Sequence, residues 1–175
     1  MNELVRLFAD IVLHRRGPAD VPASGAMLGA SLVAYLLAGV LALMPGSHDP
    51  STIPAQLAID LLIVVGLVGG LLVLTGRRHR LLQTLSALFG AGALLSALSA
   101  PFLWIAASAP DPAQPGPAVV LSSMALVVLL IASLMVTAHV VRSAMDWPYP
   151  AGLIAALVYF GVSIEVFRKL FPEAG

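Results

Sequence analysis

The sequence predicts an all-α fold: a polytopic transmembrane helical bundle of five spans, preceded by an N-terminal interfacial amphipathic helix. Of the 175 residues, 59% are hydrophobic and only 10% are charged, against roughly 45–50% and about 25% in a soluble domain. The apolar residues fall into five runs of about 20 residues, which is the length a helix needs to cross a hydrocarbon core of about 30 Å. No strand-type alternation is present, so we expect helices, which satisfy their own backbone hydrogen bonds in lipid.

Residues 1–22 are expected to form an amphipathic helix followed by a linker. Apolar residues recur at helical spacing over residues 1–16; they are Leu4, Leu7, Phe8, Ile11 and Val12. The stretch is too short and too charged to span, so we expect it to lie in the headgroup plane with Phe8 and Ile11 dipping into the lipid. Gly17 and Pro18 are expected to end the helix. The stretch also lacks the order of a cleavable signal peptide.

Residues 23–175 are expected to form a single transmembrane domain. Its spans are predicted over residues 26–44, 54–75, 81–107, 118–141 and 150–171. The spans show no internal repeat, so the sequence does not indicate an inverted-repeat transporter.

The basic residues predict the orientation of these spans, because Lys and Arg concentrate in cytoplasmic loops. With the N-terminus in the cytoplasm, seven basic residues face that side, namely Arg6, Arg15, Arg16, Arg77, Arg78, Arg80 and Arg142. The opposite side holds two, Arg168 and Lys169. Eight Arg against one Lys is a bias associated with GC-rich bacterial genomes. We therefore expect a multi-pass protein of the bacterial inner (plasma) membrane, with a periplasmic C-terminus.

Ionisable residues inside spans are the first candidates for function, because burying them in hydrocarbon is costly. Asp60 and Glu165 are expected at a similar depth towards the outer side. Serines of spans three and four are expected near the same level; they are Ser96, Ser99, Ser122 and Ser123. One interpretation is a polar chamber open to the exterior. The other is hydrogen bonding between helices, with Glu165 paired locally to Arg168 and Lys169.

His139 is the candidate polar residue of the inner face. It is expected near the cytoplasmic end of span four, on the same side as His14 and His79. The surrounding arginines would repel a divalent cation, so we expect a packing histidine rather than a metal or haem ligand. The chain contains no H-E-x-x-H, G-x-S-x-G or phosphate-binding glycine loop. We therefore predict no catalytic, cofactor-binding or metal-binding residue, and no enzyme.

Two further patterns concern packing and lipid contact. The motifs Gly25-x-x-x-Gly29 and Gly66-x-x-x-Gly70 predict close helix packing within the chain, with self-association as the alternative. Basic clusters on the inner face either set topology or bind anionic lipid headgroups, at about 1 kcal/mol per residue. These clusters contain Arg15, Arg16, Arg77, Arg78 and Arg80. The patches are small and pressed against the bilayer, so nucleic acid is not expected as a partner.

Residues 76–90 (GRRHRLLQTLSALFG) resemble the connector between spans two and three of the Yip family of five-span membrane proteins. The approach to span one at residues 16–18 is similar to small proteobacterial proteins of this type. The resemblance implies five tightly spaced spans and no catalytic residue. Of the Asp-Leu-Tyr-Gly-Pro signature of eukaryotic members only Gly-Pro remains, so the resemblance does not extend to Rab binding.

The leading hypothesis is a non-enzymatic, Yip-like scaffold or adaptor that binds membrane proteins or lipids, or forms a homo-oligomer. Its contact surface would be the N-terminal helix and the basic inner face. The alternative is a small transporter or channel subunit that uses the intramembrane polar layer around Asp60. A third hypothesis is a membrane enzyme built around His139.

Overall fold

The computed structural model of the chain describes residues 2–47, 49–108 and 116–171, and these ranges contain helices and no strand. The helices are α1 (Asn2–Val12), α2 (Gly25–Leu43), α3 (Ile53–Val64), α4 (Gly70–Leu74), α5 (Leu81–Ala107), α6 (Pro117–Met145) and α7 (Tyr149–Leu170). A π-helical turn, Val65–Gly69, joins α3 to α4 in one rod. Five helices are long and apolar enough to cross a membrane. The predicted all-α bundle is confirmed, and the chain is a multi-pass membrane protein.

The predicted ends of the spans agree with the helices to within one residue, with one exception. Helix α6 continues to Met145, four residues beyond its predicted end. It ends where Asp146 adopts a left-handed conformation, with φ at 53°. A short polar side chain tolerates this region better than a branched one, so Asp146 acts as the stop that hydropathy alone does not mark.

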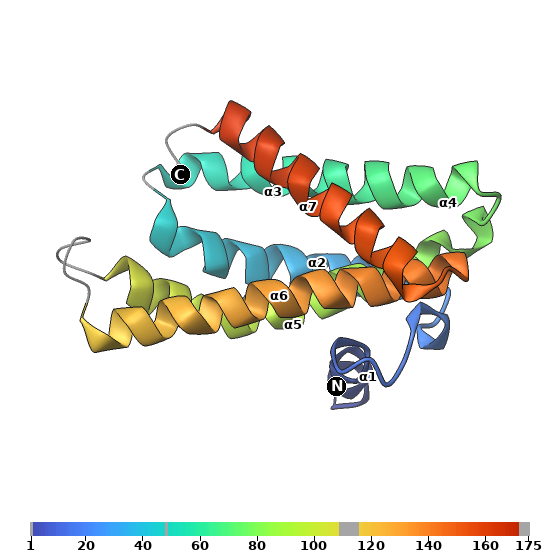
Figure 1. Cartoon of the computed structure of the whole chain (residues 1–175), viewed down its shortest axis with the longest axis horizontal. Helices are drawn as coiled ribbons and strands as arrows, with labels where there is room; N and C mark the ends of the chain where they lie inside the picture. Colours follow the sequence, from blue (N-terminus) through green and yellow to red (C-terminus); the bar gives the residue numbers. More distant parts are fainter. Residues whose placement is uncertain (1, 48, 109–115, 172–175) are drawn as a thin grey trace.

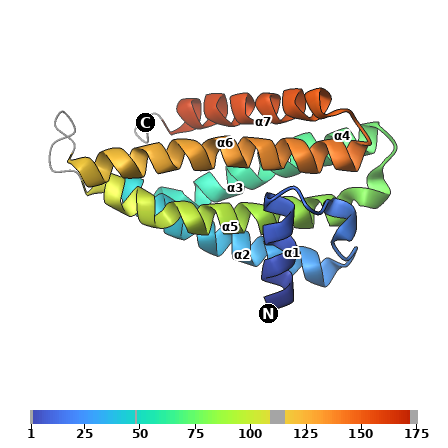
Figure 2. The same ribbon diagram turned by 60° about the horizontal axis from the view of Figure 1, so that its bottom comes forward.

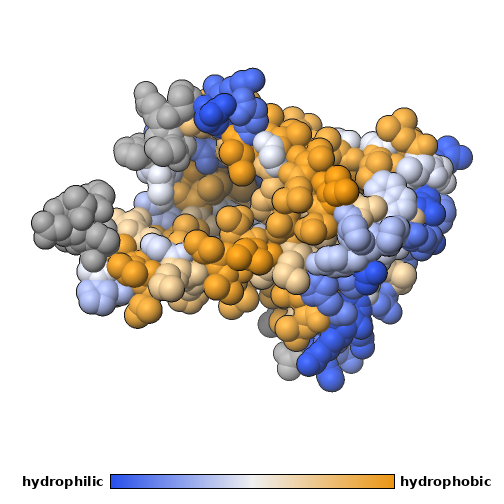
Figure 3. All heavy atoms as spheres, in the orientation of Figure 1, coloured by the Kyte–Doolittle hydropathy of each residue, from blue (hydrophilic) through white to orange (hydrophobic). Residues whose placement is uncertain are grey.

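Four spans, α2, α5, α6 and α7, form the closely packed part of the bundle, and the rod of α3 and α4 forms a looser second part (Figures 1 and 2). Helix α5 packs along α2 on one side and α6 on the other, and α7 packs along α6. The rod of α3 and α4 makes few contacts with α2 and α7, and α7 crosses over it. Figure 3 shows hydrophobic residues over the middle of the bundle, with a hollow between α6 and the region of α3 and α7. The second span is therefore the least tightly held.

Helix α1 lies across α5 and α6, as Figure 2 shows, rather than along them. The prediction that Phe8 and Ile11 dip into lipid is wrong. Both are buried in a cluster with residues of α5 and α6, among them Ala87 and Val140. A Cβ atom on Gly90 would overlap the ring of Phe8. The apolar face of α1 is thus buried against the bundle.

Helix α1 ends before the predicted Gly17-Pro18 stop. His14 has φ at 59°, its N–H donates to the Ile11 carbonyl at 3.0 Å, and the Arg15 N–H donates to the Asp10 carbonyl at 2.8 Å. This pair of bonds is a Schellman motif, which closes the last turn. Gly17 instead begins the 3-10 turn Pro18–Asp20, and its N–H donates to Asp20 Oδ2 at 2.8 Å.

The glycine motifs do not mark the places where helices approach each other. A Cβ atom would meet nothing within 4 Å at any of the four motif positions, Gly25, Gly29, Gly66 and Gly70. The predicted packing within the chain is therefore wrong for them, and self-association stays a prediction. Close approaches occur at other glycines: a Cβ on Gly92 would lie 2.7 Å from the Tyr35 ring, and one on Gly152 would lie 2.6 Å from the Ala138 carbonyl oxygen.

Candidate functional site

Asp60 joins three helices inside the bundle. It lies on α3, is half-buried, and accepts hydrogen bonds from two phenols. Tyr35 of α2 donates to Oδ2, and Tyr159 of α7 donates to Oδ1 at 3.2 Å. A carboxylate in a span needs such donors, because lipid supplies none. Asp60 is thus the point at which the loosely packed α3 is tied to α2 and α7.

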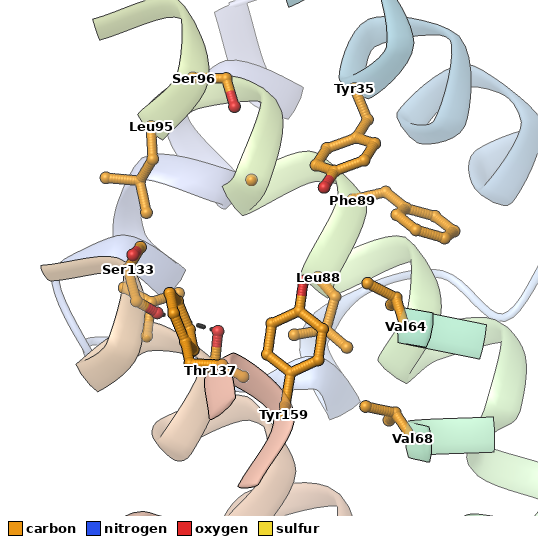
Figure 4. A pocket seen from close by; sticks show the side chains of 13 residues that line it. Tyr35, Val64, Val68, Leu88, Phe89, Leu95, Ser96, Ser133, Thr137 and Tyr159 are labelled. Atoms are coloured by element: carbon orange, nitrogen blue, oxygen red, sulfur yellow. Dashed lines mark hydrogen bonds between the residues drawn. The ribbon is translucent and has the colours of Figure 1, made fainter. Parts of the chain in front are cut away.

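A cavity of about 200 Å³ adjoins the two phenols (Figure 4). Its polar lining consists of Tyr35, Tyr159, Ser96, Ser133 and Thr137. Its remaining lining is apolar and comprises Val64, Val68, Leu88, Phe89, Gly92, Leu95, Val136 and Phe160. One water needs only about 10–15 Å³, so the space admits a small solute.

The polar lining of the cavity presents mainly hydrogen-bond acceptors. Both phenols direct their protons to Asp60. Ser133 Oγ donates to the Leu130 carbonyl at 2.7 Å, and Thr137 Oγ1 donates to the Ser133 carbonyl at 2.9 Å. The lone pairs of these oxygens remain. No ion pair in the described part of the chain includes Asp60. The site therefore complements a positively charged group.

The predicted polar layer is only partly assembled. Of its serines, Ser96 lines the cavity, whereas Ser99 Oγ donates to the Ser96 carbonyl at 2.9 Å. Ser122 is buried outside the cavity lining, and the exposed Ser123 donates to the Val119 carbonyl at 2.9 Å. Glu165 follows the local-pairing interpretation, with Arg168 Nη2 at 2.7 Å and Lys169 Nζ at 3.3 Å. Glu165 is thus paired within its own helix and not with Asp60.

Sequence reasoning missed Tyr35 and Tyr159, the two residues that bind Asp60. Each lies in the middle of a span with apolar residues on both sides, where an aromatic hydroxyl would lack a partner in lipid. That signal, a lone tyrosine far from the membrane interface, would have pointed to an intramembrane acceptor. Asp60 is the acceptor that this reasoning requires.

His139 belongs to a second, separate polar contact. It is buried; its Nε2 lies 2.9 Å from the Arg16 carbonyl oxygen, and its ring meets His14 edge-on with 4.6 Å between centroids. His79 is exposed on the 3-10 turn Arg78–Arg80. Two of the three histidines therefore meet. Within residues 2–47, 49–108 and 116–171, no group of three or more metal-ligand side chains is found. The pair holds the segment after α1 against α6.

Several predicted lipid-contact residues are engaged with the protein itself. Arg80 Nη1 donates to the Ala144 carbonyl and to Asp146 Oδ2, both at 2.9 Å, and Arg77 lies 3.4 Å from the same carboxylate. The hydrogen bond from Arg80 lowers the pKa of the exposed Asp146 carboxyl below its usual value. Arg16 lies 3.5 Å from Asp10. Arg15 and Arg78 are exposed. We call this end of the bundle, with residues 77–80 and 142–146, the basic end.

Comparisons with models of protein families, with curated proteins and with solved structures gave no match. The geometry of Asp60, its two phenols and the adjoining cavity is therefore the basis for inferring function.

Proposed function

We propose that the protein binds a small cationic solute in the cavity beside Asp60 and carries it across the membrane, as a small transporter or transporter subunit. The supporting observation is the carboxylate of Asp60, which lies within a span. It accepts from two phenols and has no basic partner among the described residues. A charge at this depth is costly, at about 2.5–3.5 kcal/mol on insertion scales. A bound cation would offset that cost.

Exchange of the cation for a proton follows from the same chemistry. The carboxyl of Asp60 can hold a proton, or it can carry the negative charge that attracts the solute. Asp60 releases its proton to the side from which the cation enters, and it takes up another proton from the opposite side when the cation leaves there. Each occupied state is then neutral, which suits a site surrounded by hydrocarbon.

The packing of α3 supports movement at this site. Its contacts with α2 and α7 are few, and the π-helical turn Val65–Gly69 begins five residues after Asp60. Such turns are rare in proteins, and those that occur often lie at functional sites. Opening of α3 relative to α2 and α7 would change the access to the cavity from one side of the membrane to the other.

The proposed orientation has the basic end in the cytoplasm of a bacterium, at its inner membrane. Arg77, Arg78 and Arg80 lie together at that end, whereas the described basic residues of the far end are Arg168 and Lys169, which are both paired with Glu165. This distribution follows the positive-inside rule.

The test is flux into liposomes that contain the purified chain and a pH-sensitive dye. With an outward proton gradient, external methylammonium or sodium should raise the internal proton loss above that of empty liposomes. Asp60→Asn should abolish the difference, while Glu3→Gln, which removes an exposed carboxyl outside the spans, should leave it unchanged. Equal flux through Asp60→Asn and the unmodified chain would overturn the proposal.

A Yip-like adaptor is the second candidate, and one observation favours it. The glycine face of α2 at Gly25 and Gly29 is uncovered, and such a face admits close approach of a helix from another protein. The apolar face of α1 is already buried, and Arg77 and Arg80 are already paired, so the α2 face is the better contact surface. Crosslinking in intact cells tests this: Gly29→Leu should abolish capture of a membrane partner, whereas Asp60→Asn should not.

A further inference from the structure

We infer that the solute is an organic ammonium ion, held by an aromatic cage, rather than a metal cation. The inference rests on the proposed function, because it names the class of cation that the cavity takes. Four of the thirteen lining residues are aromatic, and they come from three helices: Tyr35 of α2, Phe89 of α5, and Tyr159 and Phe160 of α7.

The rings are held at different angles around the cavity. Tyr35 and Phe89 have centroids 5.4 Å apart and planes inclined at 40°. Tyr159 and Phe160 have centroids 5.2 Å apart and planes inclined at 84°. The faces of aromatic rings carry negative charge density and attract ammonium groups, most strongly where water is excluded. Figure 4 shows Tyr35 and Tyr159 beside the cavity, with Ser133 on the side opposite Tyr35 and Thr137 next to Tyr159.

The position of Asp60 disfavours a metal ion. A hard metal cation binds through direct contact with six or more oxygen atoms. Asp60 is bonded to Tyr35 and Tyr159 and is not among the residues that line the cavity. Its charge therefore acts on the cavity from behind the phenols. A methylated ammonium ion, whose charge is spread over carbon-bound hydrogens, needs no direct carboxylate contact.

The size and apolar lining fit the same class of ligand. The cavity of about 200 Å³ is smaller than the roughly 300–1,000 Å³ of sites for drug-sized molecules. Aliphatic side chains supply surface for the alkyl groups of the ligand; these are Val64, Val68, Leu88, Leu95 and Val136. A methylated or short-chain amine matches both the volume and the mixed lining.

Calorimetric titration of the purified full chain in detergent with tetramethylammonium, and separately with sodium, tests the inference. Tetramethylammonium should bind at least tenfold more tightly than sodium. Phe160→Leu should weaken its binding about threefold to tenfold. Phe167→Leu, on the same helix but packed on Phe171 and outside the cavity lining, should leave binding unchanged. Phe160→Trp, which restores an aromatic face, should retain binding and guards against a folding defect in the leucine variant.

The outcomes separate the inference from the proposal on which it rests. If sodium binds as tightly as tetramethylammonium, or if Phe160→Leu and Phe167→Leu behave alike, the cage is overturned; Asp60→Asn can still abolish flux, and the proposed function then stands. If tetramethylammonium binds, Phe160→Leu weakens it and Asp60→Asn does not, the cage stands and the role of Asp60 falls. Failure of tetramethylammonium to bind a folded chain overturns the cage outright.

Discussion

The ring of Phe8 occupies the place where a Cβ atom on Gly90 would stand. Helix α1 therefore rests on α5 at a residue that has no side chain. Around this contact, Leu7 and Ile11 are buried as well. The N-terminal helix is thus part of the packed bundle, and its attachment depends on the absence of one methyl group.

Gly90→Ala should loosen α1. The added Cβ would collide with the Phe8 ring, and overpacking of this kind costs about 1–3 kcal/mol. We expect a lower thermal unfolding temperature in detergent, and faster tryptic cleavage at Arg15 and Arg16. Gly29→Ala is the matched control, because its Cβ meets nothing within 4 Å and alanine favours a helix by up to about 1 kcal/mol. Equal loss of stability in both variants would contradict the prediction.

The sequence predicted the spans well, because a membrane span is determined by the length and hydropathy of a local stretch. It could not predict which faces meet, because that depends on contacts between distant residues. The motif at Gly66 and Gly70 has the right spacing for packing, yet both positions are open, while Gly90 and Gly92 make close contacts. For the same reason Asp60 was found as an intramembrane acid, but its partners Tyr35 and Tyr159 were not.

The hydrogen bond from Tyr159 to Asp60 should contribute measurably to stability. A double-mutant cycle with Tyr159→Phe and Asp60→Ala, which removes the acceptor, should give a coupling of about 0.6 kcal/mol and at most about 1.7 kcal/mol, the average and maximum measured for bonds between membrane helices. Tyr149→Phe serves as a control on the same helix, since Asp60 accepts from Tyr35 and Tyr159. Unfolding in mixed micelles supplies the four free energies. Additive losses would mean that the bond does not couple α7 to α3.

Acid should loosen the basic end through Asp146. The Arg80 hydrogen bond lowers the pKa of this carboxyl from its ordinary value of 3.8, so the folded protein holds the proton less tightly than the unfolded chain. The stabilisation is present above pH about 4 and is lost as pH falls through the lower, folded pKa.

Asp146→Asn should remove this dependence, and asparagine also tolerates the left-handed backbone found there. The unfolding temperature of the unmodified chain should exceed that of the variant at pH 6, and the gap should narrow as the pH falls below 4. Because the site is exposed, the gap should also shrink in salt. A gap that widens on acidification would refute the role of Asp146.

We expect the five spans to place the two ends of the described chain on opposite sides of the membrane, with the basic end facing the cytoplasm. Alkaline phosphatase fused after Gly175 should therefore be active, and a fusion at the turn of residues 76–80 should be inactive. This orientation would put Arg168 and Lys169 on the side where basic residues are disfavoured, but each is paired with Glu165, at 2.7 and 3.3 Å. Glu165→Gln removes this pairing. It should lower phosphatase activity at Gly175, because unpaired positive charges resist export. If the phosphatase fusion at Gly175 is inactive and a green fluorescent protein fusion there is fluorescent, the predicted orientation of the last span is wrong.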